Sequence, residues 1–388
     1  MLRPRLGFGV FMAPFHPVSE NPTLCLERDR ELIQWLDELG FDEAWIGEHH
    51  SAGYEIIASP ELFIADVAAR TKHIRLGTGV VSLPYHQPLM VADRMMQLDH
   101  LTRGRAMFGV GPGLLPSDAM MLGIDPRRQR EMMTEALNAI IPLLRGEVVT
   151  MKTDWFELRE AKLQLAPYSR PHLEMAVAAS VSPSGPRTAG RWGIAMLSPA
   201  ATSSGGFNAL AYHWGVCEET ARAHGQTVDR SSWRIAGPVH IAESIAQARE
   251  DVRFGLPGWL YYFQKVVGLP GVPEQGSPEE CLDAMIEAGF VIVGTPDDLI
   301  RQIDRLEQQC GGFGAFLVTA HEWANRAATR RSYELIARYV MPRFQDSNAY
   351  TRRSMEWVQQ NRTPFLAAAA QGMLEAIQKD ADERARQG

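Results

Sequence analysis

The sequence predicts an α/β protein whose parallel strands and helices alternate and close into a (β/α)8 barrel. Short apolar runs suited to buried strands recur along the chain, and each is followed by a segment with helical spacing of apolar residues. Such alternation requires right-handed parallel crossovers, and eight units close most economically into a barrel. A doubly wound open sheet is the alternative, but no Gly-x-Gly-x-x-Gly turn follows the first strand.

The first half of the chain contains four strand–helix units. The first strand precedes a helix that opens at Asn21-Pro22-Thr23, with proline near its first turn, and ends near Gly40. Glycine and proline mark the turns between the later units. The predicted strands are 6–12, 41–50, 74–81 and 106–110, and the predicted helices are 21–40, 60–72, 89–101 and 127–145.

The second half resumes this alternation after an insertion. The predicted strands are 173–179, 194–197, 233–242 and 314–320, and the predicted helices are 183–192, 207–224, 295–309 and 324–343. We predict a barrel over residues 1–346, with insertions at about 146–172 and 255–290, after strands four and seven. A C-terminal helical extension follows over residues 347–388, in which residues 365–379 have amphipathic spacing.

The composition is that of an ordinary globular protein. Of 388 residues, 45% are hydrophobic and 22% are charged, which is ample for a large core. The net charge of −7 disfavours nucleic acid and anionic membranes as partners, and no apolar stretch approaches the length that spans a bilayer. The N-terminus runs directly into a strand pattern, and the four cysteines lie far apart. We therefore expect a reduced, cytoplasmic protein without a secretory signal.

In a barrel of this kind, the loops that follow the strands open on one face. That face should collect residues 12–15, 48–50, 79–85, 111–115, 180–185, 198–199 and 321–323. These loops are rich in histidine, glycine and apolar or aromatic residues and poor in acids, so we expect no metal site. They contain no zinc-protease histidine pair, no nucleophile elbow and no P-loop. Apolar walls with few polar groups suit a flat organic cofactor and an apolar substrate.

Three segments are candidates for the chemistry. Glu48-His49-His50 ends a buried strand, although one histidine could simply cap the next helix. The hydroxyl-rich turn 179–185 enters a helix, where backbone N–H groups and the helix dipole could hold a phosphate; the alternative is a helix cap. Gly79-Val80 lies in the third strand, where glycine permits close approach of another group or tight packing on a helix.

Together these residues resemble the bacterial luciferase-like flavin monooxygenases. The matching motifs extend over nearly the whole chain and are Gly40-Phe41-Asp42, Trp45, Glu48-His49-His50, Pro60, Leu76-Gly77-Thr78-Gly79, Leu83-Pro84, His86, Leu98-Asp99, Gly104-Arg105, Phe108-Gly109-Val110-Gly111 and Met341-Pro342. Within the family, residues 112–119, 182–186 and 352–357 are most similar to the limonene 1,2-monooxygenase group.

The resemblance implies a two-component monooxygenase. Reduced FMN or FAD would arrive from a separate NAD(P)H flavin reductase and react with O2 to form a C4a-hydroperoxide. That species would oxygenate a small apolar substrate, plausibly by epoxidation of a monoterpene such as limonene. The family also implies a homodimer or a higher homo-oligomer.

The resemblance also assigns roles to residues. His49 matches the catalytic imidazole of the family, and Glu48 and His50 would orient it or line the pocket. The peptide bond between Gly79 and Val80 matches a non-prolyl cis bond that supports the isoalloxazine ring. The remaining cofactor-binding candidates are Gly113, Leu114, Ser180, Val181, Ser182, Ser184 and Arg187.

One position departs from the family pattern. Luciferase places an arginine on the flavin phosphate from the loop after strand four, and the matching residue here is Pro112. Arg187 and the helix N-terminus are the groups we expect to meet the phosphate charge instead.

The substrate pocket has apolar and aromatic candidates, each of which could equally be plain core packing. These candidates are Met12, Phe15, Tyr54, Tyr85, Leu115 and Trp323. Two other functions stay open: a deazaflavin-dependent oxidoreductase on the same barrel, and a non-catalytic flavin-binding partner subunit. The presence of both His49 and the serine-rich turn argues against the second.

Overall fold

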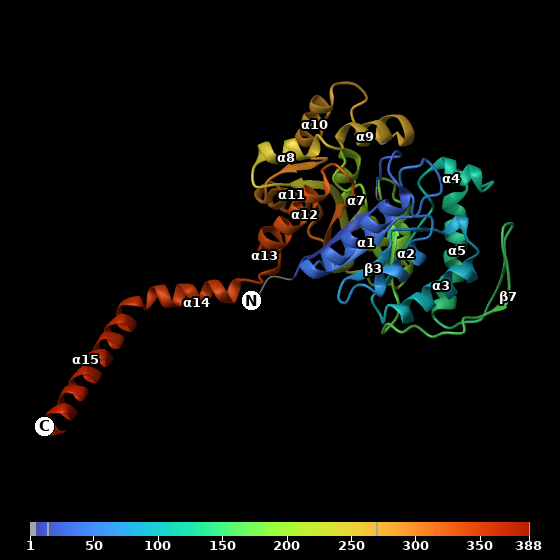
Figure 1. Ribbon diagram of the computed structural model, residues 1–388. Helices are drawn as coiled ribbons and strands as arrows, with labels where there is room; N and C mark the ends of the chain where they lie inside the picture. The colour runs from blue at the N-terminus through green and yellow to red at the C-terminus, as the bar shows by residue number, and fades with distance from the viewer. Residues whose placement is uncertain (1–4, 14, 269–270, 388) are drawn as a thin grey trace. The chain divides into compact units, whose positions relative to one another are not determined.

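A closed ring of eight parallel strands forms the centre of the computed structural model, which describes residues 5–13, 15–268 and 271–387. The ring closes because β12 pairs with β1 and β9 pairs with β10. Figure 1 shows the helices that surround it. Its strands are β1 (Gly7–Met12), β2 (Glu43–Ile46), β3 (Arg75–Thr78), β5 (Ala106–Gly111), β8 (Glu174–Ala178), β9 (Ala195–Ser198), β10 (Arg234–Ile241) and β12 (Ala315–Thr319). The predicted (β/α)8 barrel is confirmed.

Helices follow the strands and cover the outside of the ring. They are α1 (Pro22–Leu39), α2 (Pro60–Ala68), α3 (Pro88–Leu101), α5 (Gln129–Leu144), α6 (Ser184–Trp192), α7 (Ser204–Ala223), α8 (Ile245–Val252), α11 (Pro296–Cys310) and α12 (Arg326–Leu335). Local sequence sets their ends. The Asn21 side chain accepts a hydrogen bond from the backbone of Thr23, and Gly40 ends α1 in the left-handed conformation.

Several short elements differ from the sequence prediction. The third strand is interrupted after Thr78 and continues as β4 (Val81–Ser82), with a cis bond between Gly79 and Val80. The expected loop after strand four contains a helix, α4 (Pro116–Met121), and β11 (Ile292–Gly294) adds to β10 outside the ring. The last predicted helix is divided into α12, a π-helical turn (Ile336–Val340) and α13 (Met341–Gln345). Segments this short contain too few residues to show the hydrophobic periodicity of a helix or a strand.

The two predicted insertions contain different structures. Residues 146–172 include an antiparallel hairpin of β6 (Val149–Lys152) and β7 (Glu157–Ala161). The described part of 255–290 is mostly helical and contains α9 (Leu256–Tyr261), a π-helix η3 (Tyr262–Val267) and α10 (Pro278–Glu287). The bounds given to these insertions stay predictions.

The barrel interior is layered from one end to the other. At the N-terminal end of the strands, Arg234 pairs with Glu43 at 2.7 Å, and Arg75 pairs with Glu174 at 2.6 Å. The middle layer is apolar and consists of Trp45, Met107, Ala176, Ala195, Leu197, Ala236, Ala315 and Leu317. Alternation along the strands then places Phe11, Ala178 and Thr319 at the C-terminal mouth, where all three are partly exposed.

Contacts divide the described chain into two compact units, residues 5–341 and 342–387. The second unit contains α14 (Ala349–Gln360) and α15 (Arg362–Gln387), and the Trp357 and Phe365 rings lie 4.9 Å apart within it. α15 is longer than the predicted helix 365–379. The domain boundary placed at residue 346 stays a prediction, and residues 1–4 and 388 of that division lie outside the described residues.

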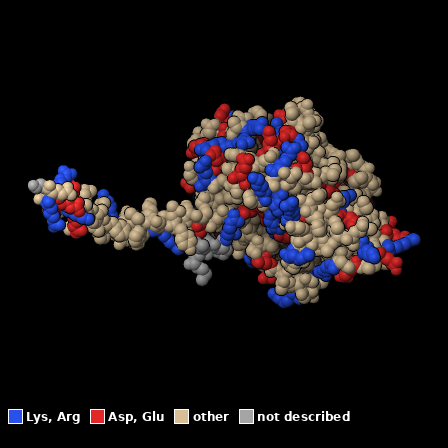
Figure 2. Space-filling model, turned by 60° about the horizontal axis from the view of Figure 1, so that its bottom comes forward, with Lys and Arg blue, Asp and Glu red and all other residues tan. Residues whose placement is uncertain are grey.

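Acidic and basic side chains are not segregated on the face of the protein that Figure 2 shows. On the face shown in Figure 2, acidic and basic side chains alternate over the barrel. The four cysteines are all buried and unpaired with one another. Among the described residues, no helix is both long enough and apolar enough to cross a membrane.

Candidate active site

Glu48 anchors the end of strand β2 to the neighbouring strand. Its side chain is buried, and one carboxylate oxygen lies 2.8 Å from Nε2 of His50 and 2.6 Å from Nε2 of His86. The other oxygen accepts a hydrogen bond of 2.6 Å from the backbone of Ser82, just past the cis bond. Burial alone would raise the pKa of Glu48, but these donors outweigh it and lower that pKa. Glu48 is therefore a carboxylate that holds two imidazoles and a backbone turn in place.

His49 lies between two other carboxylates. Its Nε2 is 2.8 Å from Glu55, and its Nδ1 is 3.7 Å from Asp118. Burial opposes the charged ring, but the two acids outweigh it and raise the pKa of His49 to about 10. At neutral pH the ring is therefore an imidazolium. Among the described residues, its buried Nδ1 has no partner at hydrogen-bond distance, and Asp118 is its ion-pair partner beyond that distance.

Asp118 joins the loop after β2 to the helix α4. It accepts hydrogen bonds from the backbone of His50 at 3.2 Å and from the Ser51 hydroxyl. These contacts, with His49, outweigh burial and lower the pKa of Asp118. Neither Asp118 nor Glu55 was among the residues predicted for the site. The available signal for Asp118 was the helix-opening pattern Pro116-Ser117-Asp118, from which no helix was predicted.

Three glycines lie at the C-terminal ends of barrel strands. Gly47, Gly79 and Gly111 all follow or end barrel strands there. A β-carbon on Gly111 would lie 2.6 Å from the Val80 side chain, and one on Gly79 would lie 2.9 Å from Trp45. Neither position admits a side chain without displacement, so both glycines let neighbouring groups pack closely against the backbone at these strand ends.

The loop after β5 is fixed at Gly113. This residue has a φ of +93°, and a β-carbon there would overlap the Tyr85 hydroxyl. Gln129 ties the same loop down by donating 2.8 Å to the carbonyl of Pro112 and 3.0 Å to Tyr85. Leu114 then projects outward with 69% of its surface exposed. The structure thus presents the backbone of Gly113 and the side chain of Leu114 at the rim.

The serine-rich turn stands at the N-terminus of α6. Ser180, Val181 and Ser182 are exposed, and the hydroxyls of Ser182 and Ser184 are 2.8 Å apart. His213 from α7 holds the turn through a 3.0 Å contact with the carbonyl of Val181. Arg187 lies one turn into α6 and is exposed. These residues can present hydroxyls, N–H groups and one guanidinium to an anion.

The predicted pocket walls fall into two environments. Phe15 and Tyr54 stack with ring centroids 4.8 Å apart, and both contact Tyr262 from the insertion. Trp323 packs in the same apolar cluster. The Tyr85 ring lies edge-on to His50, with ring centroids 5.8 Å apart, and Leu115 is buried. Met12 is completely buried, and its neighbour Phe11 faces the barrel interior instead.

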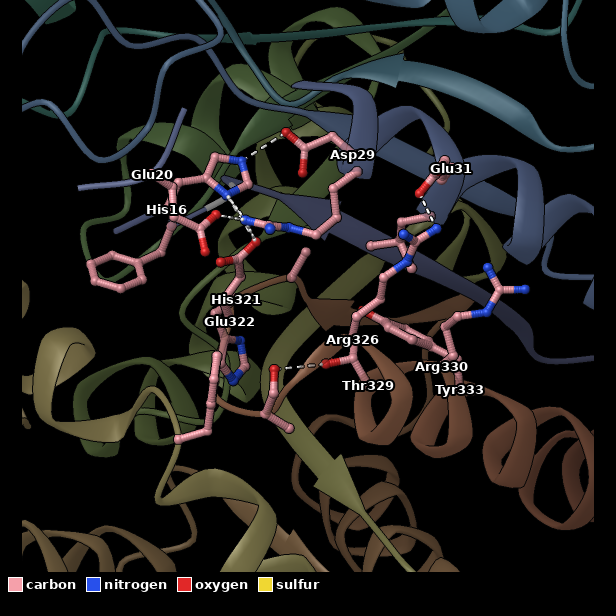
Figure 3. Close-up of a pocket in the computed structure, with 16 residues that line it drawn as sticks. His16, Glu20, Asp29, Glu31, His321, Glu322, Arg326, Thr329, Arg330 and Tyr333 are labelled. Carbon is pink, nitrogen blue, oxygen red and sulfur yellow. Dashed lines mark hydrogen bonds and ion pairs between the residues drawn. The ribbon is translucent and has the colours of Figure 1, made fainter. Parts of the chain in front are cut away.

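Behind Phe15, a charged pocket of about 100 Å³ lies between α1 and the loop after β12. Figure 3 shows His16 at its wall, between Asp29 at 2.9 Å and Glu322 at 3.0 Å. These acids outweigh burial and raise the pKa of His16 to about 9. Arg28 and Glu20 complete the network. Its charges are paired with one another, so it reads as a structural ion network beside the mouth.

Residues 6–312 match the family described as luciferase-like monooxygenases. The chain belongs to the luciferase-like monooxygenase family. It is 46% identical to limonene 1,2-monooxygenase of Rhodococcus erythropolis over 98% of this chain and 96% of that one. It is also 46% identical to 4-hydroxyprotoasukamycin monooxygenase of Streptomyces nodosus subsp. asukaensis, over 94% of this chain and 99% of that one.

A solved structure of a type II Baeyer-Villiger monooxygenase shares the fold. It is the oxygenating constituent of 3,6-diketocamphane monooxygenase from Pseudomonas putida, in complex with FMN. Its TM-score is 0.74 at 25% identity, and the match covers 87% of this chain and 98% of that one. The family resemblance and the flavin-dependent monooxygenase class predicted from the sequence are confirmed.

Proposed function

We propose that this chain is the oxygenase component of a two-component monooxygenase that uses reduced FMN and O2 on a small apolar substrate. A cyclic monoterpene of the limonene type is the substrate class best supported, because the relative named for limonene is 46% identical over almost the entire chain. The observation that carries the proposal is the buried His49 at the C-terminal end of strand β2, whose pKa is raised to about 10 by Glu55 and Asp118 despite its burial.

The residues at the mouth fit a flavin. The strand ends at Gly79, Val80 and Gly111 would take the isoalloxazine ring, and Leu114 would close over its edge. The turn Ser180–Ser184 and the N-terminus of α6 would hold the phosphate, with Arg187 as the cation in place of the family arginine. FMN is preferred over FAD because the diketocamphane relative is described with FMN.

Reduced flavin, when bound, supplies the electrons that activate O2. His49 would donate a hydrogen bond from Nδ1 and keep its proton, because Glu55 and Asp118 stabilise the imidazolium. Glu48 and His50 would fix the loop that carries it. The aromatic cluster of Phe15, Tyr54 and Trp323 would exclude water and receive the apolar substrate.

A separate reductase would deliver the reduced flavin. Support comes from the diketocamphane relative, which is named as the oxygenating constituent of its enzyme, so that another constituent is implied there. A homodimer or higher homo-oligomer is proposed from the family alone.

The experiment mixes the full chain with photoreduced FMN, ¹⁸O2 and limonene, and analyses products by mass spectrometry. The proposal predicts a limonene product that carries one ¹⁸O atom and requires both FMN and O2. Reoxidation of FMN with release of hydrogen peroxide and no product would reject the monoterpene but keep the oxygenase class. Turnover that proceeds without O2 would reject the proposal.

A further inference from the structure

We propose that Tyr262, on the insertion after strand β10, is a positioning residue that fixes Glu55 and through it His49. This inference rests on the proposed function, in which His49 acts at the flavin. It assigns a part of the active site to a segment that lies outside the eight strand–helix units of the barrel.

Two successive contacts connect Tyr262 on the insertion with His49 at the C-terminal end of strand β2. The Tyr262 hydroxyl donates a hydrogen bond of 2.7 Å to one carboxylate oxygen of Glu55. The other oxygen of Glu55 lies 2.8 Å from Nε2 of His49. Glu55 therefore has one oxygen for each partner, and each contact limits the orientation that its carboxylate can take.

The hydrogen bond between Tyr262 and Glu55 is buried, so its loss would be costly. Tyr262 has no exposed surface, and only 8% of Glu55 is exposed. The Tyr262 hydroxyl is the hydrogen-bond donor to Oε1 of this buried carboxylate, while Oε2 has the ion pair with His49 and no hydrogen-bond partner among the described residues. Burial together with Glu55 holds the pKa of Tyr262 far above its usual range, which keeps the hydroxyl a donor.

The fold holds Tyr262 from several sides. It begins the π-helical segment η3, directly after α9, and its ring lies 4.6 Å from Tyr54 and 5.3 Å from Phe15. A π-helical turn rotates the following side chains relative to an α-helix, and such turns are common at functional sites. The ring contacts would remain in a phenylalanine variant, while the hydrogen bond would be lost.

The test is a double-mutant cycle between Tyr262→Phe and Glu55→Gln in the full chain. Reoxidation of reduced FMN by O2, limonene oxygenation and the Kd for FMN are measured for both single variants, the double variant and the wild type. We expect Tyr262→Phe to lower the turnover number roughly tenfold with an unchanged Kd for FMN, since one buried hydrogen bond of ~1.4 kcal/mol corresponds to that factor. In the Glu55→Gln background, the same change should cost less than about threefold.

Tyr333→Phe is the matched control. Tyr333 is also a buried tyrosine on α12, with its ring edge-on to Phe41, and it lines the charged pocket behind Phe15. Its variant should keep wild-type turnover. Equal losses for Tyr262→Phe in both backgrounds, or no loss in either, would overturn the positioning role. Wild-type turnover in His49→Ala would instead reject the proposed function, whatever Tyr262 does.

Discussion

The charge of a single imidazole decides the chemistry proposed here. His49 has a pKa raised to about 10, against an ordinary value near 6.5, because Glu55 and Asp118 flank it despite its burial. The folded protein therefore binds the proton more tightly than the unfolded chain. The resulting stabilisation is complete below about pH 6.5 and is lost as the pH rises through about 10.

Replacement of His49 by glutamine should remove this pH dependence. We expect the difference in free energy of unfolding between wild type and His49→Gln to shrink steadily from pH 7 to pH 10, as measured by urea denaturation. Oxygenase turnover of the variant should fall about 100-fold at pH 7.5, the usual scale for loss of an acid–base group. A difference in unfolding free energy that is constant over this range would contradict a charged His49.

A single added methyl group at Gly113 tests whether the close approach of this backbone to the Tyr85 hydroxyl is required. Gly113→Ala adds a methyl group that overlaps the Tyr85 hydroxyl, at a φ of +93°. We expect a loss of about 1–3 kcal/mol in unfolding free energy and weaker FMN binding. Gly123→Ala is the control, because Gly123 has a φ of +72° with no atom near its β-carbon position. If the two variants cost the same stability, the close approach to Tyr85 is not a constraint.

At the scale of elements, the turn before α6 should act on the phosphate alone. The double variant Ser182→Ala/Ser184→Ala removes two hydroxyls at the helix N-terminus. We expect its Kd for FMN to rise about tenfold, while its Kd for riboflavin, which lacks the phosphate, stays the same. Isothermal titration with both ligands measures this. Equal weakening for FMN and riboflavin would place the phosphate elsewhere.

The barrel elements could be predicted from sequence because each buried strand is a short apolar run with a helix after it. Strands 106–110 and 194–197 were located to within one residue for this reason. β11 and α4 were missed because three and six residues are too few to show a period. The cis bond at Gly79–Val80 is present, and it was expected only from the family resemblance.

In the candidate site, only residues that are consecutive in the sequence could be predicted to lie together. Glu48, His49 and His50 share one strand end, so their meeting at the mouth followed from the fold. The partners of His49 come from separate segments. Asp118 lies on a helix that was not predicted, and Tyr262 lies 207 residues after the Glu55 that it contacts. No spacing in the sequence records contacts of that kind.

At the scale of the whole molecule, residues 342–387 form a unit of their own. Every residue from 350 to 387 except Asn361 is exposed. We expect a chain that ends at residue 346 to keep the thermal unfolding midpoint and the FMN affinity of the full protein, because the removed side chains are almost all exposed. A large drop in the midpoint would show that the extension supports the barrel.

The central claim is that His49, the strand ends at Gly79 and Gly111, and the serine-rich turn surround one flavin. A crystal structure of the full chain with FMN tests it most directly. We predict the isoalloxazine ring on the Gly79–Val80 bond, the phosphate at Ser180–Ser184 and His49 Nδ1 facing the ring. A phosphate bound away from that turn, or a ring outside the barrel mouth, would contradict the account.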